Sequence, residues 1–339
     1  SSSNCNCCMH LHLLWHTSMA SMAWTIGLIV GGILVCGVGG LKIFSKGPSK
    51  AKMADFYKKK TVWVTGSSSG IGKEIAVQAA SLGANVVLTG RDPDRLAAAQ
   101  AIVRAAAAEG AARRHEKLPP AVMAAPPFDM ADLAAVERAG EWVREACRVD
   151  VLIHNAGVST RSPALETSRA VEERVMAINF LGPALLTKAV LPTLVSGRGH
   201  IACINSVQGL FGIHHRTTYA ASKHALRGYF DALRAEVAFD KIGVTQVYPG
   251  YVNTNLSKNA ILGDGKNYGT TDQTTASGMD PSYAASAVLM AVSERRKEVI
   301  LADAKTKFAC LLRGLAPNLL FKILEKRAKK DMLHKKGSS

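Results

Sequence analysis

The sequence predicts an α/β fold with a doubly wound parallel sheet of about seven strands. Three observations predict it. Short apolar runs recur along residues 61–304, with helical stretches between them. A glycine-rich turn follows the first of these runs and leads into a helix. Further along, a tyrosine and a lysine stand four residues apart on a predicted helix.

The strand candidates are runs rich in Val, Ile and Leu at residues 62–64, 86–88, 151–154, 201–204, 244–248 and 299–301. Strands that alternate with helices form a parallel sheet with helices on both faces, and ligands bind at the carboxyl ends of its strands. Residues 97–108 are typical of an alanine-rich helix. The pairs Pro119-Pro120 and Pro126-Pro127 follow it and predict a surface loop, because proline cannot continue a helix.

The glycine-rich turn reads Thr65-Gly66-Ser67-Ser68-Ser69-Gly70-Ile71-Gly72 and precedes residues 73–82, which have helical composition. A strand that enters a helix through such a turn presents free N–H groups and the positive end of the helix dipole, which together bind a pyrophosphate. Glycine is needed where a Cβ would block that approach. The pattern predicts a Rossmann-type dinucleotide site, and a purely structural turn is the alternative.

Tyr219 and Lys223 share one helical face because they are four residues apart, and Ser206 ends an apolar run thirteen residues upstream. A free tyrosine has a pKa of about 10. A nearby cation lowers that pKa, so the pair can exchange protons while Ser206 holds a substrate oxygen. The alternative is a solvated tyrosine beside an unrelated lysine.

These motifs, with His154-Asn155-Ala156-Gly157, Asn179 and Pro249-Gly250, resemble the short-chain dehydrogenase/reductase family over residues 61–303. The resemblance implies that Tyr219 is the general acid of carbonyl reduction and the base of the reverse reaction. It implies that Lys223 lowers the pKa of that phenol and binds the nicotinamide ribose, and that Ser206 orients the carbonyl. Asn179 would anchor a water that links Lys223 to solvent.

Two residues depart from the family pattern. His154 stands where an asparagine is usual, and we expect a buried histidine satisfied by backbone rather than an additional acid. Asn205 stands where a serine usually precedes Ser206. Neither change removes a group with a proton-transfer role.

Charge after the second predicted strand indicates the cofactor. Folds that prefer NAD place an acidic residue there, whereas an arginine accommodates the 2′-phosphate of NADP. This chain has Gly90 and then Arg91, which favours NADP(H). The alternative is that Arg91 pairs with Asp92 or Asp94 at the surface. The expected cofactor-binding residues are Thr65, Gly66, Ser67, Ser68, Ser69, Gly70, Ile71, Gly72, Arg91, Asp129 (toward the adenine), Asn155, Ala156, Gly157, Tyr219, Lys223, Pro249, Gly250 and Thr254 (toward the carboxamide); no metal is expected.

Most of the net charge of +16 lies at the two ends of the chain. Residues 1–60 hold seven lysines against Asp55, and residues 305–339 hold ten Lys or Arg against Glu325 and Asp331. The nearly balanced middle argues against a nucleic-acid surface on the fold. We therefore expect a polar tail (1–18), a transmembrane anchor (19–44), a basic linker (45–60), a catalytic domain (61–304) and a C-terminal apolar and basic helix (305–339).

The anchor is predicted because residues 19–41 carry no charge and are long enough to span a bilayer. A cleaved signal peptide is disfavoured because no charged region precedes the apolar run. Lysines follow the run, and the positive-inside rule then places the catalytic domain in the cytosol. The resemblance implies the endoplasmic reticulum membrane, with a type II orientation as the alternative.

The expected partners are the lipid bilayer, a lipophilic carbonyl or alcohol substrate such as a ketone lipid, steroid or retinoid, and a second copy in a homodimer. A nucleotide-binding redox regulator and a membrane interaction protein with little turnover remain as alternatives. The apolar residues 308–324 precede the basic Lys326-Arg327. Such a segment can lie on an anionic bilayer, or it can pack on the fold with a solvated tail.

Overall fold

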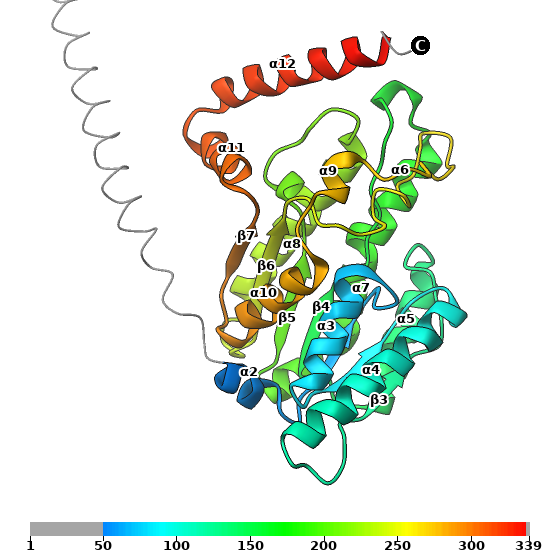
Figure 1. Cartoon of the computed structure of the whole chain (residues 1–339), viewed down its shortest axis with the longest axis vertical. Coiled ribbons are helices and arrows are strands. Elements are labelled where there is room, and N and C mark those ends of the chain that lie inside the picture. The colour runs from blue at the N-terminus through cyan, green and yellow to red at the C-terminus, as the bar shows by residue number, and fades with distance from the viewer. Residues whose placement is uncertain (1–49, 337–339) are drawn as a thin grey trace, which may run out of the picture. The chain divides into compact units, whose positions relative to one another are not determined.

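A single parallel sheet organises the computed structural model, which describes residues 50–336. Its seven strands lie in the order β3-β2-β1-β4-β5-β6-β7 (Figure 1). They are β1 (Thr61–Val64), β2 (Asn85–Leu88), β3 (Val122–Ala124), β4 (Val151–His154), β5 (His200–Ile204), β6 (Gly243–Pro249) and β7 (Glu298–Leu301). The chain builds outward from β1 to β3 and then restarts at β4 on the other side of β1, so the predicted doubly wound fold is confirmed.

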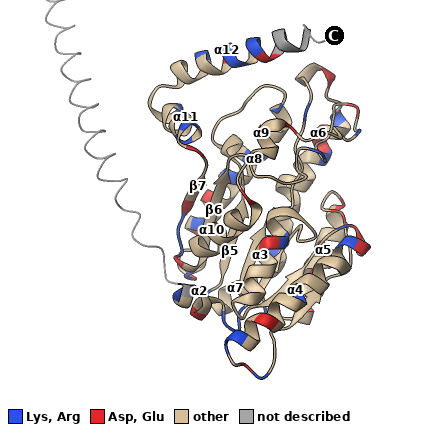
Figure 2. Ribbon diagram, viewed as in Figure 1, with Lys and Arg blue, Asp and Glu red and all other residues tan. Residues whose placement is uncertain are grey.

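Helices follow the strands along the chain. They are α2 (Lys50–Tyr57), α3 (Gly70–Ser81), α4 (Pro93–Arg113), α5 (Leu133–Ala146), α6 (Arg169–Met176), α7 (Gly182–Gly197), α8 (Thr217–Glu236), α9 (Gln273–Ala276), α10 (Pro281–Ser293), α11 (Ala304–Leu315) and α12 (Pro317–Lys336), with short turns η1 (Ala164–Glu166), η2 (Ala177–Leu181) and η3 (Val207–Gly209). Figure 2 marks the charged residues along these helices and the loops between them. The predicted tail (1–18), the predicted anchor (19–44) and the start of the linker lie outside the described residues.

Side chains that alternate along each strand build two apolar layers, one on each face of the sheet. Val62 and Val64 of β1 pack in one layer with α3, α4 and α10, whereas Trp63 packs in the other with α5, α7 and α8. Trp63 is fully buried. Burying a large apolar side chain stabilises a fold by about 1.5–3 kcal/mol, so both layers hold the sheet rigid beneath its carboxyl edge.

Helix α2 occupies the second half of the predicted linker and packs against the fold. Tyr57 is fully buried, and its hydroxyl donates a hydrogen bond to the carbonyl of Leu289 in α10 at 2.9 Å. Burial raises the pKa of this phenol well above its ordinary value. Residues 50–57 therefore fasten the start of the described chain to the rest of the fold.

The prediction of a loop at the two proline pairs is wrong in one respect, because strand β3 lies between them. Val122 pairs with Val86 of β2, and Ala124 pairs with Leu88. The strand lies at the edge of the sheet, where flanking prolines are tolerated because no further strand needs their missing N–H groups. A three-residue strand between prolines leaves too short a pattern to recognise in the sequence.

Two further features concern helices. Among the described residues, Arg169–Gly197 has the length and hydropathy of a membrane span, and 56% of its apolar window is buried inside the fold. This stretch comprises α6, the π-turn η2 and α7. The C-terminal region, predicted as one helix, forms two, because the chain leaves helical geometry at Ala316 and restarts at Pro317.

Candidate active site

A cavity of about 700 Å³ opens at the carboxyl ends of the central strands. This is where ligands bind in doubly wound sheets. Most of the expected site residues line it: Gly66, Ser68, Ser69, Gly70, Ile71, Arg91, Asp129, Asn155, Ala156, Gly157, Ser206, Tyr219, Lys223, Pro249, Gly250 and Thr254. Thr65, Ser67, Gly72 and Asn179 are expected site residues that lie behind its wall instead.

Thr65 and Ser67 fasten the glycine-rich turn to the neighbouring strands. The hydroxyl of Thr65 accepts hydrogen bonds from the backbone N–H groups of Asn155 at 3.0 Å and Ala156 at 3.1 Å. The hydroxyl of Ser67 donates to the carbonyl of Thr89 at 3.2 Å and accepts from its N–H at 2.9 Å. Both residues therefore shape the turn without lining the cavity.

The turn leaves room for a ligand close to the backbone. Gly66 and Gly70 have positive φ angles of +63° and +56°, which side-chain-bearing residues rarely adopt. A Cβ on Gly72 would lie 2.3 Å from Nδ2 of Asn155 and 2.5 Å from the carbonyl oxygen of Gly66. Ser69 precedes α3 without a side-chain capping bond, so the first N–H groups of the helix remain available near the cavity. This cradle fits the pyrophosphate of a nicotinamide cofactor.

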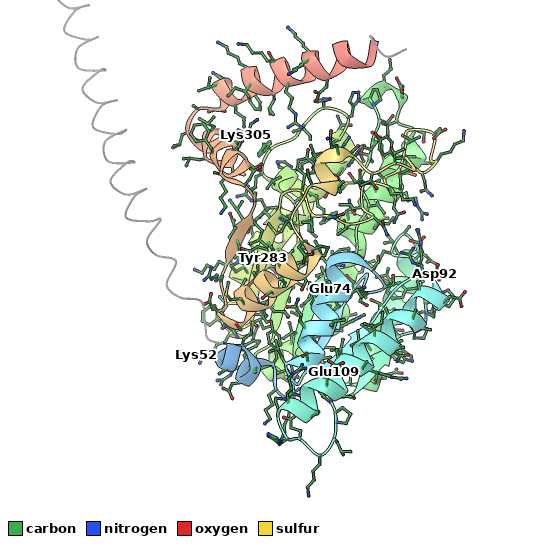
Figure 3. All side chains as sticks on the ribbon, in the orientation of Figure 1. Lys52, Glu74, Asp92, Glu109, Tyr283 and Lys305 are labelled. Carbon is green, nitrogen blue, oxygen red and sulfur yellow. The ribbon has the colours of Figure 1, made fainter. Side chains whose placement is uncertain are left out.

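Arg91 lines the cavity after β2 with a side chain that is 62% exposed. Its Nη1 lies 4.0 Å from Oδ2 of Asp129, which also contacts Nη2 of Arg174 at 2.7 Å. Asp92, labelled in Figure 3, is one of the two partners considered from the sequence. Its side chain instead accepts a hydrogen bond from the N–H of Arg95 at the start of α4. Burial opposes ionisation of Asp129, but a bond from the N–H of Ala131 and the charge of Arg174 hold its pKa below the ordinary value.

Tyr219 is buried in α8 and lines the cavity together with Ser206. Burial raises the pKa of this phenol above its ordinary value, and the hydroxyl of Ser206 and the charges of Arg161 and Arg216 oppose that rise. The sequence predicts a pKa lowered by Lys223. The net shift is upward because burial outweighs the nearby cations, and the effect of Lys223 on the phenol remains a prediction. A phenol with a raised pKa is protonated at neutral pH.

Lys223 is buried beside Tyr219, with Nζ 5.9 Å from the centroid of its ring. The ammonium donates a hydrogen bond to the carbonyl of Ile204 at 3.0 Å. Burial lowers the pKa of Lys223 to about 8, because taking a charge out of water costs free energy. Its pKa therefore lies close to neutral pH, so that Lys223 begins to lose its charge in mildly basic solution.

Asn205 connects three parts of the site. Its Oδ1 accepts from the N–H of Ser206 at 2.9 Å, and its Nδ2 donates to the carbonyl of Lys223 at 3.2 Å and to Oε1 of Gln246 at 3.1 Å. A serine at this position could not reach all three groups, because its hydroxyl carries a single proton. Asn205 thus fixes the strand end that presents Ser206 relative to the helix that presents Lys223.

Asn179 lies in the π-turn η2 and is almost fully buried. Its Oδ1 accepts from the N–H of Val158, and its Nδ2 donates to the carbonyl of Val158 and to Oγ of Ser222, each at 2.9 Å. A Cβ on Gly157 would lie 3.2 Å from Oδ1 of Asn179 and 3.6 Å from Nζ of Lys223. The predicted water-holding role of Asn179 remains a prediction.

A partly buried ion cluster beside Tyr219 is not predicted from the sequence. Oδ2 of Asp272 lies 2.8 Å from Nη2 of Arg161, 3.6 Å from Nη2 of Arg216 and 2.8 Å from Oγ of Ser257. Two cations share one carboxylate, and burial lowers the pKa of Arg216 to about 10. Arg216 precedes Tyr219 by three residues, and this spacing is the only sequence signal for the cluster.

His154 is buried, as predicted, but its partner is a side chain. Nε2 lies 2.8 Å from the hydroxyl of Thr187, which donates its single proton to the carbonyl of Pro183. His154 must therefore donate through Nε2–H. Its Nδ1 has no partner among the described residues, and burial lowers the pKa of this histidine to about 3, so the ring is neutral at neutral pH.

Comparison with known proteins identifies relatives of the chain. Residues 60–263 match the short chain dehydrogenase family. The chain is 43% identical over 283 residues to dehydrogenase/reductase SDR family member 7B of Xenopus laevis, and the match covers 83% of this chain and 85% of that protein.

Solved structures share the fold. A metagenomic short-chain oxidoreductase in complex with NADP has a TM-score of 0.59 and 26% identity, and the match covers 74% of this chain and 99% of that chain. A short chain dehydrogenase/reductase from Burkholderia phymatum in complex with NAD has a TM-score of 0.65 and 23% identity, with 78% and 95% covered.

Proposed function

We propose that this chain, which belongs to the short-chain dehydrogenase family, is a membrane-anchored carbonyl reductase that uses NADPH. One observation carries the proposal: Ser206, Tyr219 and Lys223 line the same cavity as the glycine-rich turn. A nicotinamide cofactor is supported because related structures hold either NADP or NAD. The preference for NADPH, the carbonyl substrate and the membrane are our proposals.

The residues of the cavity account for reduction. The reduced nicotinamide would supply a hydride to the carbonyl carbon. Tyr219 donates its O–H proton to the carbonyl oxygen, and Ser206, which lines the same cavity, holds that same oxygen. The nearby ammonium of Lys223 stabilises the phenolate that remains. Tyr219 is protonated at neutral pH and can therefore serve as the acid of reduction.

The proposed preference for NADPH rests on the residues that follow β2. Gly90 offers no carboxylate to a ribose hydroxyl, and Arg91 lines the cavity with an exposed guanidinium. The carboxylate of Asp92 is engaged in capping α4. A guanidinium forms paired hydrogen bonds with a phosphate, so this end of the cavity suits a 2′-phosphate.

A lipophilic substrate is favoured by the segment that follows β6. Val252, Leu256 and Ile261 line the cavity, so the cover of the site is partly apolar. Closure of such a segment excludes water from the reaction. We further propose that the predicted anchor (19–44) holds the enzyme in the endoplasmic reticulum membrane, with its catalytic domain in the cytosol as the charge bias predicts, and that the enzyme is a homodimer.

The experiment is an NADPH-oxidation screen of the detergent-solubilised full chain against ketone lipids, steroids and retinal. A Tyr219→Phe variant should lose turnover but keep its NADPH affinity, because it lacks only the acidic proton. The matched control is Tyr283→Phe, which removes a hydroxyl from an exposed tyrosine of α10. Turnover by the Tyr219→Phe variant at the parent rate would disprove the assigned acid.

The alternatives give different results in the same screen. NADPH binding with no turnover on any carbonyl would favour a redox-linked regulator. No nucleotide binding at all would favour a membrane interaction protein. Protease protection of intact microsomes would decide between the cytosolic and type II orientations.

A further inference from the structure

The two helices that follow the sheet expose apolar side chains where they meet. On α11, Phe308, Leu311 and Leu315 recur at a spacing that places them on one face, and they are 58%, 49% and 59% exposed. Leu319 and Ile323 of α12 are 51% and 46% exposed. We define the corner patch as Phe308, Leu311, Leu315, Leu319, Phe321 and Ile323. These six side chains fall within sixteen residues of sequence, so they form a local concentration of exposed apolar surface.

The corner patch is not the face by which these helices pack on the fold. Leu312 and Leu320 point inward and are buried against Phe211, which belongs to the segment after η3. Oδ2 of Asp331 lies 3.2 Å from Nε2 of His214 and secures α12 to the same segment. The inner faces of both helices are therefore occupied, and the corner patch is left over on the outside.

Cations border the corner patch. Lys322, Lys326 and Lys329 recur at positions i, i+4 and i+7 of α12, are all exposed, and form one lysine row. Figure 2 shows these positive charges along α12. The guanidinium of Arg313 lies 5.3 Å from the centroid of the Phe321 ring and joins the two helices on their outer side.

The occupant of this surface must be apolar and anionic at once. A second copy of the chain, meeting this face with its own, would bring two lysine rows together, which is unfavourable. An anionic bilayer offers acyl chains to the corner patch and negative headgroups to the lysine row. We propose that the corner patch and the lysine row of α12 rest on the surface of an anionic lipid bilayer.

This contact adds to the anchor of the proposed function and depends on it only for bringing the domain to a membrane. The segment that α11 and α12 cover includes Val207 and Phe211, directly after Ser206. Contact of α11 and α12 with lipid would therefore affect the position of the loop that follows Ser206. The geometry suits a lipophilic substrate that leaves the bilayer near the active site.

The test uses the full chain in nanodiscs of phosphatidylcholine, without or with phosphatidylserine at about one lipid in four. Hydrogen–deuterium exchange of residues 304–331 should slow several-fold in the discs that contain phosphatidylserine. The triple variant Lys322→Gln, Lys326→Gln, Lys329→Gln should lose this slowing. A matched variant, Lys117→Gln, Lys188→Gln, Lys241→Gln, removes the same charge from exposed lysines elsewhere and should keep it.

Equal exchange in both kinds of disc would overturn the proposal. Slowing that depends on protein concentration in either lipid would also overturn it, and would indicate a second copy as the occupant. Whether the chain stays bound to discs of phosphatidylcholine alone tests the predicted anchor independently of the contact made by α11 and α12. Because exchange requires no turnover, failure of this contact is distinguishable from failure of the proposed enzymatic activity.

Discussion

Replacing Lys223 with methionine should stabilise the cofactor-free protein at neutral pH while removing its activity. Lys223 is buried, and that burial lowers its pKa from 10.5 to about 8. A charge in this position costs the folded state free energy that methionine, of similar length and without charge, does not. If Lys223 has the proposed catalytic role, function opposes stability at this position.

The magnitude follows from the two pKa values. One pKa unit corresponds to about 1.4 kcal/mol, so the penalty on the folded protein is about 3 kcal/mol. Methionine also leaves the carbonyl of Ile204 without its partner, which costs about 1 kcal/mol at any pH. At pH 7 the variant should therefore be about 2 kcal/mol more stable than the parent.

The pH dependence separates the charge from every other effect of the substitution. Below pH 8 Lys223 is protonated in both the folded and the unfolded states, so the penalty is present in full. As the pH rises from 8 toward 10.5, the folded lysine loses its proton first and the parent gains stability. By pH 9.5 the advantage of the variant should have shrunk by about 2 kcal/mol.

The assay is urea denaturation of the full chain in one detergent at pH 7 and pH 9.5, with cofactor left out. The matched control is Lys188→Met, which changes an exposed lysine of α7 and should show no such pH-dependent difference. A stability difference between the Lys223→Met variant and the parent that is the same at both pH values would refute the reasoning, whatever its sign.

Three further predictions concern the cavity. An Arg91→Ala substitution should weaken NADPH binding roughly ten- to hundredfold and NADH binding little; equal losses in titrations with both cofactors would rule out a phosphate contact. A Gly72→Ala substitution should destabilise the protein by about 1–3 kcal/mol, because its Cβ would overlap Asn155. A Gly228→Ala substitution should be neutral or stabilising, because its Cβ would meet nothing within 4 Å. Thermal denaturation compares the stability of the two variants. An Asp272→Asn substitution leaves Arg161 and Arg216 without their carboxylate, so their charges should lower the pKa of Tyr219 further. The acid limb of the pH profile for alcohol oxidation should then move down by on the order of one pH unit. A lower rate with an unmoved limb would mean that the cluster is only structural.

Much of the fold is predictable because its signals are local. The bounds of the predicted apolar runs lie within one residue of those of β1, β2, β4, β5, β6 and β7, since buried parallel strands need continuous apolar residues. Strand β3 is missed because an edge strand of three residues is specified by its neighbour β2 rather than by its own pattern. The break at Pro317 likewise depends on where α11 and α12 pack.

The candidate site is predictable in its membership but less so in its electrostatics. The four-residue spacing correctly brings Tyr219 and Lys223 to one cavity. The same spacing cannot reveal that burial raises the pKa of the tyrosine, because burial depends on residues distant in sequence. Asp272 meets Arg161 across 111 positions of the chain, which no local pattern encodes.

The short strand β3 also bears on how the protein behaves when many copies are made at once. An exposed sheet edge normally offers a row of free N–H groups to which another molecule can add a strand, which is a route to aggregation. Here that edge is three residues long, and Pro120 and Pro126 interrupt the chain on either side of it, without N–H groups to donate. On the β3 side, the apolar strands behind this short edge are therefore shielded from pairing with strands of other molecules.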